Sequence, residues 1–461
     1  MRPFVAVVDP LSVAPRHLAD KGAGRLIKRA VSRQVQGDNP QMPKMPRKLL
    51  IVAFHYPPVH GSSGIQRTLK FSTYLRDHGW EPLILTVSPQ AYEQVSDDQL
   101  GEIPDRMLVE RAFGLDTAKH LAIRGRHFRW MAQPDRWISW WPAAVWSGLK
   151  LIRQQRPQAI LSTFPIATAH LIAMTLQRLT KLPWIADCRD SMTEPGYPVD
   201  PLTWRTTRRI EAAMVKRCTK AIFTTSGTHQ MYAERYPQVP ASRWAVIENG
   251  YDEENFRAAE SEGTSAPRGS SQQVTLVHSG ILYPHERDPR PFFDALSELK
   301  ASGDIRPETL RVVLRATAWD NVYRPLLDAA GIGDIVHLEP PVSYISALRE
   351  MLSADALLLF QGSNCNHQIP AKMYEYLRSS RPIFALTDPS GNTAAALQGS
   401  GANDIVDIAD KRAIADGLRT FLRKLRDGTA KGVSLEVAER NSRRSRTGEL
   451  ARLLDEAVGS R

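Results

Sequence analysis

Short, mainly apolar runs alternate with helix-like spans along most of this chain, and that alternation limits its fold more than any other feature of the sequence. Such runs are typical of parallel strands buried on both faces. Strands that alternate with helices predict an α/β fold with parallel sheets. In the first half the predicted strands are Lys48–Phe54, Pro82–Val87, Gln158–Ser162 and Pro183–Ala186, and the predicted helices are Pro142–Gln155 and Ala167–Thr180.

A second series follows residues 257–273, which are rich in Ser, Gly, Glu and Ala and are typical of a linker. A chain of 461 residues exceeds the usual size of one domain, so two domains are expected. Residues 1–46 are then a basic extension, 47–256 and 274–430 the two domains, and 431–461 a C-terminal helix packing back across both. The predicted strands of the second domain are Val274–His278, Leu310–Leu314, Ile335–Leu338, Ala356–Phe360, Ile383–Leu386 and Ile405–Val406.

The composition, 42% hydrophobic and 24% charged, is that of a soluble globular protein. No apolar run approaches the roughly 18–20 residues that cross a bilayer, and the N-terminus lacks the pattern of a signal peptide. The three cysteines are few and far apart, which favours a reducing compartment without a thiolate metal cluster. We therefore expect a cytoplasmic protein.

The net charge of +11 is concentrated at the N-terminus, where residues 1–48 carry ten Lys and Arg against three Asp. Within this stretch, Arg16–Gln34 has the pattern of a basic amphipathic helix that could lie on a membrane. Basic tails bind anionic lipid or nucleic acid in some proteins and are simply solvated in others. A start of translation at Met45 is a further alternative.

Tryptophan is dense between Lys119 and Trp146, where five Trp are interleaved with four Arg. Aromatic side chains beside cations mark a membrane interface, a sugar-stacking surface or a platform for single-stranded nucleic acid. Core aromatics beneath a long loop would give the same pattern. The sequence leaves these alternatives open.

The stretch Asn364–Leu386 predicts a loop, a helix over Ala371–Arg378 and a strand. Lys372 and Glu375 are three residues apart and share one face near the helix N-terminus, where backbone N–H groups favour anions. A bound phosphorylated ligand would suit this arrangement. The alternative is an ordinary amphipathic helix with an exposed Lys–Glu pair.

Charged residues also follow several predicted strands, at the edge where open parallel sheets bind ligands. Asp187-Cys188-Arg189-Asp190 ends one strand, and His278-Ser279-Gly280 ends another. Arg287, Arg290 and Arg315 lie near strand ends, and their forked guanidinium donors would suit a diphosphate. Solvent-exposed arginines and an Arg–Asp pair between loops are the alternatives.

Six pieces of the sequence, in order, are similar to those of GT-B glycosyltransferases of the family-4 group, over roughly residues 48–456. This resemblance implies two Rossmann-like, doubly wound parallel-sheet domains facing a cleft, with a nucleotide-sugar donor held mainly by the second. The pieces are HYPPVHGSSGIQR, WWPAAVWSGLKLIRQQRPQAILSTFPIATAHL, PWIADCRD, VIENGYDEENF, HSGILYPHERDP and IPAKMYEYLRSSRPIFAL.

The resemblance assigns Glu375 to the second glutamate of the family's E-x7-E element, which bonds the donor's ribose hydroxyls. The first glutamate is replaced by His367, which we expect to donate to a sugar hydroxyl or to phosphate. Arg287 stands where the family has a phosphate-binding Lys, and the family's partner Arg is Ile281 here. We expect Arg290, Arg315 or Lys372 to compensate.

The same resemblance places the glycine-rich loop, with Gly61, Ser63 and Gly64, near the donor phosphate and the acceptor. Ser279 and Gly280 fall at the donor-binding strand end, and Asp190 is a candidate for orienting the acceptor. The chain has no Asp-x-Asp, so we expect neither a metal nor a cofactor, and expect Arg287 and Lys372 to stabilise the leaving group of a retaining transfer. The implied partners are a nucleotide-sugar donor, a glycan or lipid-linked acceptor and the inner face of a membrane.

Three other functions remain open at this point. A nucleotide-sugar 2-epimerase shares the fold and needs no acceptor. A catalytically inactive GT-B assembly protein is a second alternative, because it would not need the family glutamate that His367 replaces. Nucleic-acid binding through the basic tail and the Trp/Arg segment is not expected, because the charge is not gathered on one recognisable module.

Overall fold

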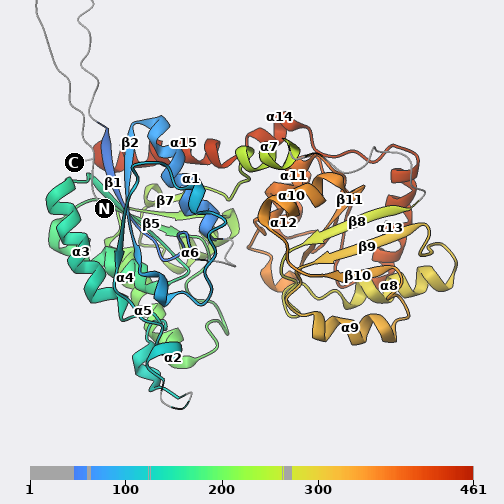
Figure 1. Cartoon of the computed structure of the whole chain (residues 1–461), viewed down its shortest axis with the longest axis horizontal. Helices are drawn as coiled ribbons and strands as arrows, with labels where there is room; N and C mark the ends of the chain where they lie inside the picture. The colour runs from blue at the N-terminus through green and yellow to red at the C-terminus, as the bar shows by residue number, and fades with distance from the viewer. Residues whose placement is uncertain are drawn as a thin grey trace, which may run out of the picture. The chain divides into compact units, whose positions relative to one another are not determined.

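The computed structural model describes residues 46–59, 64–122, 124, 126–261, 263 and 273–459, and these form two parallel β-sheets with their covering helices (Figure 1). The expected basic extension over residues 1–46 lies outside the described residues except for Pro46. We call the part built on the first sheet the N-terminal lobe and the part built on the second the C-terminal lobe.

The N-terminal lobe contains a seven-stranded sheet in the order β3-β2-β1-β4-β5-β6-β7. Every neighbouring pair is parallel. The central strands are apolar and buried on both faces, as parallel strands covered by helices must be. The strands are β1 (Arg47–Val52), β2 (Trp80–Val87), β3 (Leu108–Ala112), β4 (Ala159–Thr163), β5 (Trp184–Cys188), β6 (Lys220–Phe223) and β7 (Trp244–Val246).

Helices cover both faces of this sheet, and apolar side chains fill the space on each side. Asp200 and Thr225 cap the N-termini of α5 and α6 by accepting backbone N–H bonds. The helices are α1 (Gly64–Tyr74), α2 (Thr117–His120), α3 (Trp140–Gln155), α4 (Ala167–Thr180), α5 (Pro201–Arg217) and α6 (Ser226–Arg235).

The C-terminal lobe repeats this arrangement with six parallel strands in the order β10-β9-β8-β11-β12-β13. Its strands are β8 (Val274–Ser279), β9 (Leu310–Arg315), β10 (Val336–Glu339), β11 (Ala356–Gln361), β12 (Ile383–Thr387) and β13 (Ile405–Val406). Its helices are α8 (Arg290–Ala301), α9 (Asp320–Ala329), α10 (Tyr344–Ser353), α11 (Lys372–Ser379), α12 (Asn392–Gly399) and α13 (Lys411–Arg426).

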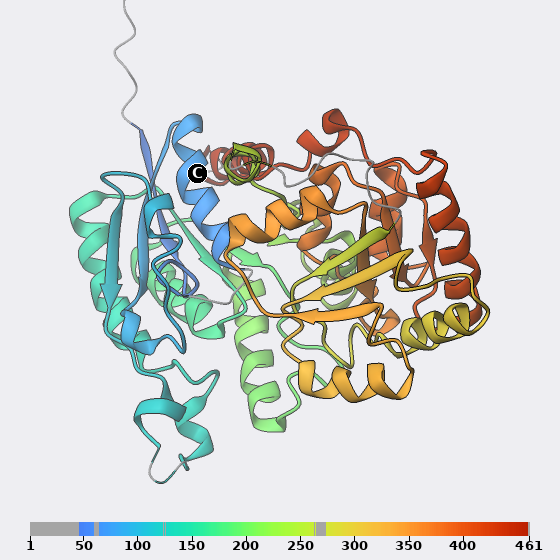
Figure 2. The same cartoon turned by 45° about the vertical axis from the view of Figure 1, so that its right-hand side comes forward.

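The end of the chain contacts both lobes. Helix α14 (Leu435–Glu439) places Ala438 in the apolar cluster that covers one face of the C-terminal sheet. Helix α15 (Arg443–Gly459) lies beside α1 in both views and buries Leu450 and Leu454 against the N-terminal sheet (Figures 1 and 2). Asp455 on α15 also accepts a hydrogen bond of 2.9 Å from the Trp80 indole.

The observed elements follow the sequence expectations closely, with three differences. Strand β3 was not predicted, because its sequence LVERA carries two charges and is only partly buried at the sheet edge. Residues 257–261 of the expected linker belong to helix α7 (Glu253–Ser261), whose Phe256 packs with the C-terminal sheet. The predicted C-terminal helix is two helices, α14 and α15.

Among the described helices, none has the length and apolar character needed to cross a bilayer.

Candidate functional site

The C-terminal sheet has its switch point between β8 and β11, where the strand order changes direction. In open parallel sheets ligands bind at this point, beyond the carboxyl ends of the strands. Ser279 ends β8, Gly280 follows it, and the loop after β11 leads to Lys372 at the start of α11. Three of the predicted site residues therefore lie where a ligand of this sheet is expected.

The ammonium group of Lys372 reaches back over the end of β8. Its Nζ lies 3.0 Å from Nε2 of His278. A β-carbon added to Gly280 would lie 3.2 Å from Nζ of Lys372. Gly280 also has a φ of 101°, which residues with side chains rarely adopt. Glycine is thus favoured here by the backbone conformation and by the approach of the lysine.

His278 is buried, and as a neutral imidazole it accepts a hydrogen bond from the ammonium group of Lys372. Its Nδ1 lies 2.9 Å from the backbone oxygen of Leu358, and an N–H there leaves Nε2 as the acceptor for Lys372. Burial lowers the pKa of His278 well below its usual value, and the charge of Lys372 lowers it further. Burial likewise lowers the pKa of Lys372, with Arg287 adding to the effect. The lysine therefore has no counter-charge in its nearest contact.

Arg287 stands beside Lys372 as a second cation of the site. Its Nη1 donates to the backbone oxygen of Ile281 at 2.9 Å, and its Nε lies 3.3 Å from Oε1 of Gln361 at the end of β11. Among the described residues, no carboxylate forms an ion pair with Arg287 or Lys372. The switch point of this sheet thus holds two adjacent cations whose contacts are all neutral.

Glu375 lies one turn along α11 from Lys372 and is partly buried. Its Oε1 accepts a hydrogen bond of 2.7 Å from the hydroxyl of Tyr344, the first residue of α10. Burial raises the pKa of Glu375, while Tyr344, Arg443 and Lys372 oppose the shift. The structure therefore brings Lys372 and Glu375 together near one helix end, as their spacing predicts.

Arg315 and Arg290, two of the residues expected to compensate for Ile281, are engaged elsewhere. Arg315 forms a bidentate pair with Glu350, at 2.8 and 2.6 Å, which raises its pKa. Arg290 is exposed and pairs with Asp288 two residues away. Both guanidinium groups therefore carry their own counter-charge, and Lys372 is the candidate that remains.

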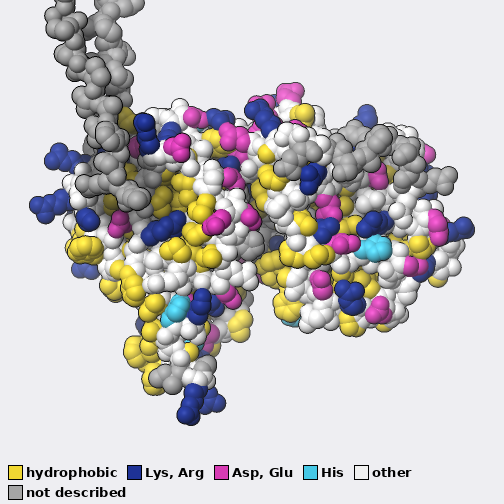
Figure 3. All heavy atoms as spheres, in the orientation of Figure 1, with side chains coloured by type: hydrophobic (Ala, Val, Ile, Leu, Met, Phe, Trp, Pro, Cys, Tyr) yellow, Lys and Arg dark blue, Asp and Glu magenta, His cyan; other side chains and the backbone are white. Residues whose placement is uncertain are grey.

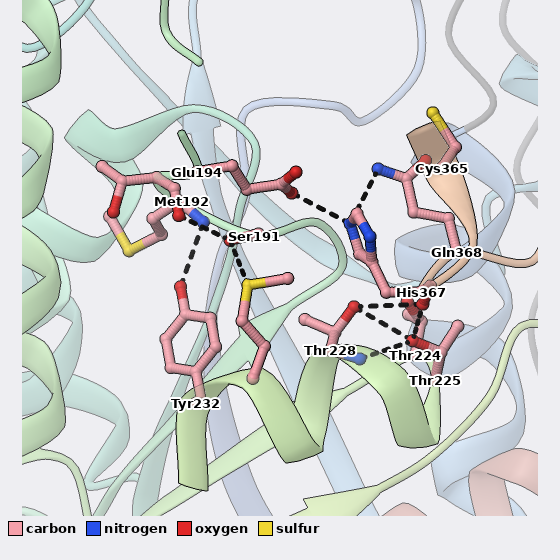
Figure 4. A network of polar contacts seen from close by, with 12 residues as sticks. Ser191, Met192, Glu194, Thr224, Thr225, Thr228, Tyr232, Cys365, His367 and Gln368 are labelled. Carbon is pink, nitrogen blue, oxygen red and sulfur yellow. Dashed lines mark hydrogen bonds and ion pairs between the residues drawn. The ribbon is translucent and has the colours of Figure 1, made fainter. Parts of the chain in front are cut away.

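The side chain of His367 contacts a carboxylate of the N-terminal lobe. Its Nε2 lies 3.0 Å from Oε1 of Glu194 in the N-terminal lobe. The two side chains face each other in Figure 4, with the Gln368 amide beside the ring. The Thr225 hydroxyl, at the start of α6, donates to the His367 backbone oxygen at 2.6 Å. In this structure His367 joins the lobes.

The predicted N-terminal lobe residues lie around α1 and the end of β5. Gly64 begins α1, and a β-carbon there would lie 1.9 Å from Nη1 of Arg189, so any other residue would require the guanidinium group to move. Asp190 retains solvent-accessible surface, yet the protein around it desolvates the carboxyl and raises its pKa, with Arg189 opposing the shift. Gly61 and Ser63 lie outside the described residues.

Asp187 is a structural residue of this block. Both its oxygens accept hydrogen bonds from Arg67 on α1, at 2.8 and 2.9 Å, and both side chains are buried. Arg67 also donates to the backbone oxygens of Ile247 and Glu248 at 2.9 Å. This pair ties α1 to the carboxyl ends of β5 and β7 and engages four of the five N–H groups of the arginine.

Sequence reasoning missed three contacts of the site: the role of His278 beneath Lys372, Tyr344 against Glu375, and Glu194 against His367. A histidine at the end of a buried strand was a visible signal for the first. Tyr344 and Glu194 carry no such signal, because their partners are far away in sequence. In the described part of the chain, no three His, Cys, Asp or Glu gather to hold a metal ion.

Residues 64–250 match the family model described as a glycosyl transferase 4-like domain. The described fold is similar to that of sucrose-phosphate synthase from Thermosynechococcus elongatus, with a TM-score of 0.62 and 13% identity over 90% of this chain and 100% of that one. HepE of Anabaena, solved in complex with UDP, gives 0.60 and 13% over 89% and 100%. Among curated proteins, none matches the sequence.

The UDP-GlcNAc 2-epimerase of Neisseria meningitidis, bound to UDP-GlcNAc, is also similar, with a TM-score of 0.52 and 11% identity over 88% of this chain and 99% of that one. At these identities the likeness establishes the fold. Both lobes are therefore Rossmann-like in the GT-B arrangement, and the N-terminal lobe carries the family match.

Proposed function

We propose that this GT-B protein, with its glycosyl transferase 4-like domain at residues 64–250, transfers a sugar from a nucleotide-sugar donor to a hydroxyl of an acceptor. The observation that carries the proposal is the pair of cations Lys372 and Arg287 at the switch point of the C-terminal sheet. HepE, a protein of the same fold, was solved with UDP and with UDP-glucose.

A buried cation is costly unless an anion or hydrogen-bond acceptors compensate it. Among the described residues, the polar contact of Lys372 is the neutral His278, and the polar contacts of Arg287 are two neutral oxygens. The diphosphate of a nucleotide sugar would supply two negative charges to these two groups. The same groups would stabilise the nucleoside diphosphate as it leaves, since its charge grows as the glycosidic bond breaks.

The other site residues receive roles on the same basis. Glu375, oriented by Tyr344, would accept hydrogen bonds from the two ribose hydroxyls of the donor. Asp190 would orient the acceptor hydroxyl, and we propose retention at the anomeric carbon without a metal ion. Arg189, over the N-terminus of α1, would add a positive charge on the acceptor side.

The proposed acceptors are a glycan, a polysaccharide or a lipid-linked saccharide. For the last, the protein would work in the cytoplasm in peripheral contact with the membrane. Support for this setting comes from the basic residues 1–48 and from the exposed aromatic and cationic side chains between Lys119 and Trp146.

A nucleotide-sugar 2-epimerase is the second candidate, because the epimerase of Neisseria meningitidis shares the fold over most of this chain. It would change the donor without any acceptor. Incubation with each nucleotide sugar alone, followed by chromatography of the sugar, separates the two reactions: an epimerised nucleotide sugar would replace the transferase proposal.

The transferase proposal is tested by thermal shifts with UDP-, GDP-, ADP- and dTDP-sugars. A donor that binds the folded protein raises its melting temperature by mass action, and the proposal predicts a selective rise with one nucleotide base. Glu375→Ala should abolish the rise, whereas Glu350→Ala, which removes the carboxylate bound to Arg315, should leave it. If no nucleotide sugar or nucleoside diphosphate raises the melting temperature, the catalytically inactive reading replaces the proposal.

A further inference from the structure

A projection of the N-terminal lobe, formed by α2, the 3₁₀ turn Arg129–Ala132 and the loop between them, extends beyond the ends of α4 and α5 in both views (Figures 1 and 2). We call residues 117–122, 124 and 126–132 the tip. In the space-filling view the projection carries yellow apolar side chains and ends in dark-blue cationic ones (Figure 3).

The tip exposes two aromatic side chains that a globular surface would normally cover. Phe128 and Trp130 are each 70% exposed, and their rings stack on one another with centroids 6.3 Å apart. Trp146, on the outer face of the following helix α3, is 68% exposed, and the ammonium group of Lys150 lies 5.8 Å from its ring centroid. Because these side chains stay exposed, the fold does not gain the free energy that burial of their apolar surface would supply.

The base of the tip is firmly built, so its exposed aromatics do not result from a loose loop. The buried Asp116 accepts backbone N–H bonds at the start of α2 and a bond of 2.8 Å from Nε of Arg136. The backbone N–H of Thr117 donates to the Arg136 oxygen at 2.8 Å. The Gln133 amide bonds the Thr203 hydroxyl on α5 at 3.0 Å.

Cations outnumber carboxylates around the tip, where Asp200 pairs with Arg129 and, at the base, Glu93 and Asp116 pair with Arg136. Residues 117–186 contain ten Lys and Arg and a single acidic residue, Asp135. That carboxylate is turned inward, where the Thr168 hydroxyl and backbone N–H bind it at 2.9 and 2.8 Å. On the tip itself, Arg124 and Arg126 are exposed. A surface with this charge complements an anionic partner.

We propose that the tip docks on a bilayer that contains anionic lipids, with Phe128 and Trp130 entering the interface and Arg124 and Arg126 meeting the headgroup phosphates. Aromatic side chains favour the boundary between headgroups and acyl chains, and basic side chains add attraction to anionic lipid. The proposal deepens the proposed function by assigning its membrane contact to named residues. It favours lipid over nucleic acid, because the two rings stack on each other and so occupy a face that a base would need.

The test is flotation of the full-length protein with vesicles of phosphatidylcholine alone or mixed with phosphatidylglycerol. We expect the wild type to bind the mixed vesicles and to dissociate as salt rises. Phe128→Ser/Trp130→Ser should lower the partition coefficient by roughly tenfold or more. Arg124→Gln/Arg126→Gln should lower it on the mixed vesicles alone. The basic residues 1–45 are present in every variant, so their contribution cancels.

Leu435→Ser and Arg324→Gln are matched controls, since both residues are exposed on the C-terminal lobe. They should bind vesicles as the wild type does. Three results would each overturn the proposal. The wild type could fail to bind the mixed vesicles, the tip variants could bind them as well as the wild type does, or the tip could bind a single-stranded oligonucleotide instead. Vesicle binding needs no turnover: if docking depends on the tip while no nucleotide sugar binds, the docking proposal stands and the proposed function fails.

Discussion

The two lobes differ in how they compensate the cations that lie at the carboxyl ends of their strands. In the N-terminal lobe, Arg67 meets both oxygens of Asp187 and two backbone carbonyls, so all its charge is compensated within the protein. In the C-terminal lobe, Lys372 meets the neutral His278 and lies beside Arg287, another cation. Both cations lie at the carboxyl ends of the strands of their sheet. The first arrangement stabilises the fold, and the second is the one to which we assign the diphosphate of the donor.

Other buried charges of the N-terminal lobe follow the same rule. Glu211 is fully buried but accepts bonds from Arg235 and from the hydroxyls of Tyr232 and Tyr236. Lys70 pairs with Asp252 at 2.9 Å and Glu102 at 2.7 Å. The cations at the C-terminal switch point therefore differ from these three compensated charges of the N-terminal lobe, Arg67, Glu211 and Lys70.

The largest effect is expected where the compensated pair is broken. Arg67→Met would leave Asp187 as a buried, unpaired carboxylate, and we expect the free energy of unfolding to fall by about 3–5 kcal/mol. Chemical denaturation measures this change. Arg76→Met, which removes a partly exposed pair with Glu81, should cost under about 1 kcal/mol. Equal losses of unfolding free energy in Arg67→Met and Arg76→Met would contradict the distinction between a buried pair and an exposed one.

The next effect concerns the two arginines of the C-terminal lobe. Arg287→Met should weaken nucleotide-sugar binding by about 1.5–3 kcal/mol, the usual value for a hydrogen bond to a charged group. Arg315→Met should leave donor affinity nearly unchanged, because that guanidinium is held by Glu350. Isothermal titration of both variants measures the difference. If Arg315→Met lowers donor affinity while Arg287→Met leaves it unchanged, the donor-binding role belongs to Arg315 and not to Arg287.

A smaller effect is expected on stability at Lys372 itself. The folded state holds this lysine with a lowered pKa, so the charged form carries a penalty that is full below the folded pKa and vanishes as pH rises toward the unfolded value near 10.4. Lys372→Met should therefore stabilise the unliganded protein by about 1–2 kcal/mol, most at low pH, while it abolishes donor binding. Melting curves at several pH values test this, and a variant less stable than the wild type would contradict it.

The smallest effect is expected at the surface pair of Arg290 and Asp288. This pair is largely exposed, so Arg290→Met should change the free energy of unfolding by less than about 0.5 kcal/mol. Donor affinity should also stay within twofold of wild type. A large loss of donor affinity in this variant would show that Arg290 contributes to the donor site.

Much of the fold could be predicted from the sequence, because buried parallel strands and amphipathic helices have strong local patterns. Helix α4 and strand β13 have the predicted bounds, and Lys372 and Glu375 share one end of α11 as their spacing requires. The edge strand β3 was missed because its charged residues hide the apolar pattern.

The site was less predictable, because its electrostatics depend on pairs that are distant in sequence. Glu350 neutralises Arg315 from 35 residues away, and Glu194 meets His367 from 173 residues away. Asp288, only two residues from Arg290, could have been foreseen as its partner. Residue type identified the cations, but only the fold shows which of them lack a counter-charge.

The most direct test is proton uptake on donor binding. Titration of a nucleotide sugar, starting with UDP-sugars, is followed by calorimetry at several pH values between about 6 and 9 in buffers of different ionisation enthalpy. The diphosphate bridge is fully ionised there, so any proton taken up belongs to the protein. An anion that binds Lys372 raises its lowered pKa, and we predict net proton uptake that disappears in Lys372→Met together with binding. Binding without proton uptake, with equal affinity in Lys372→Met, would contradict the account.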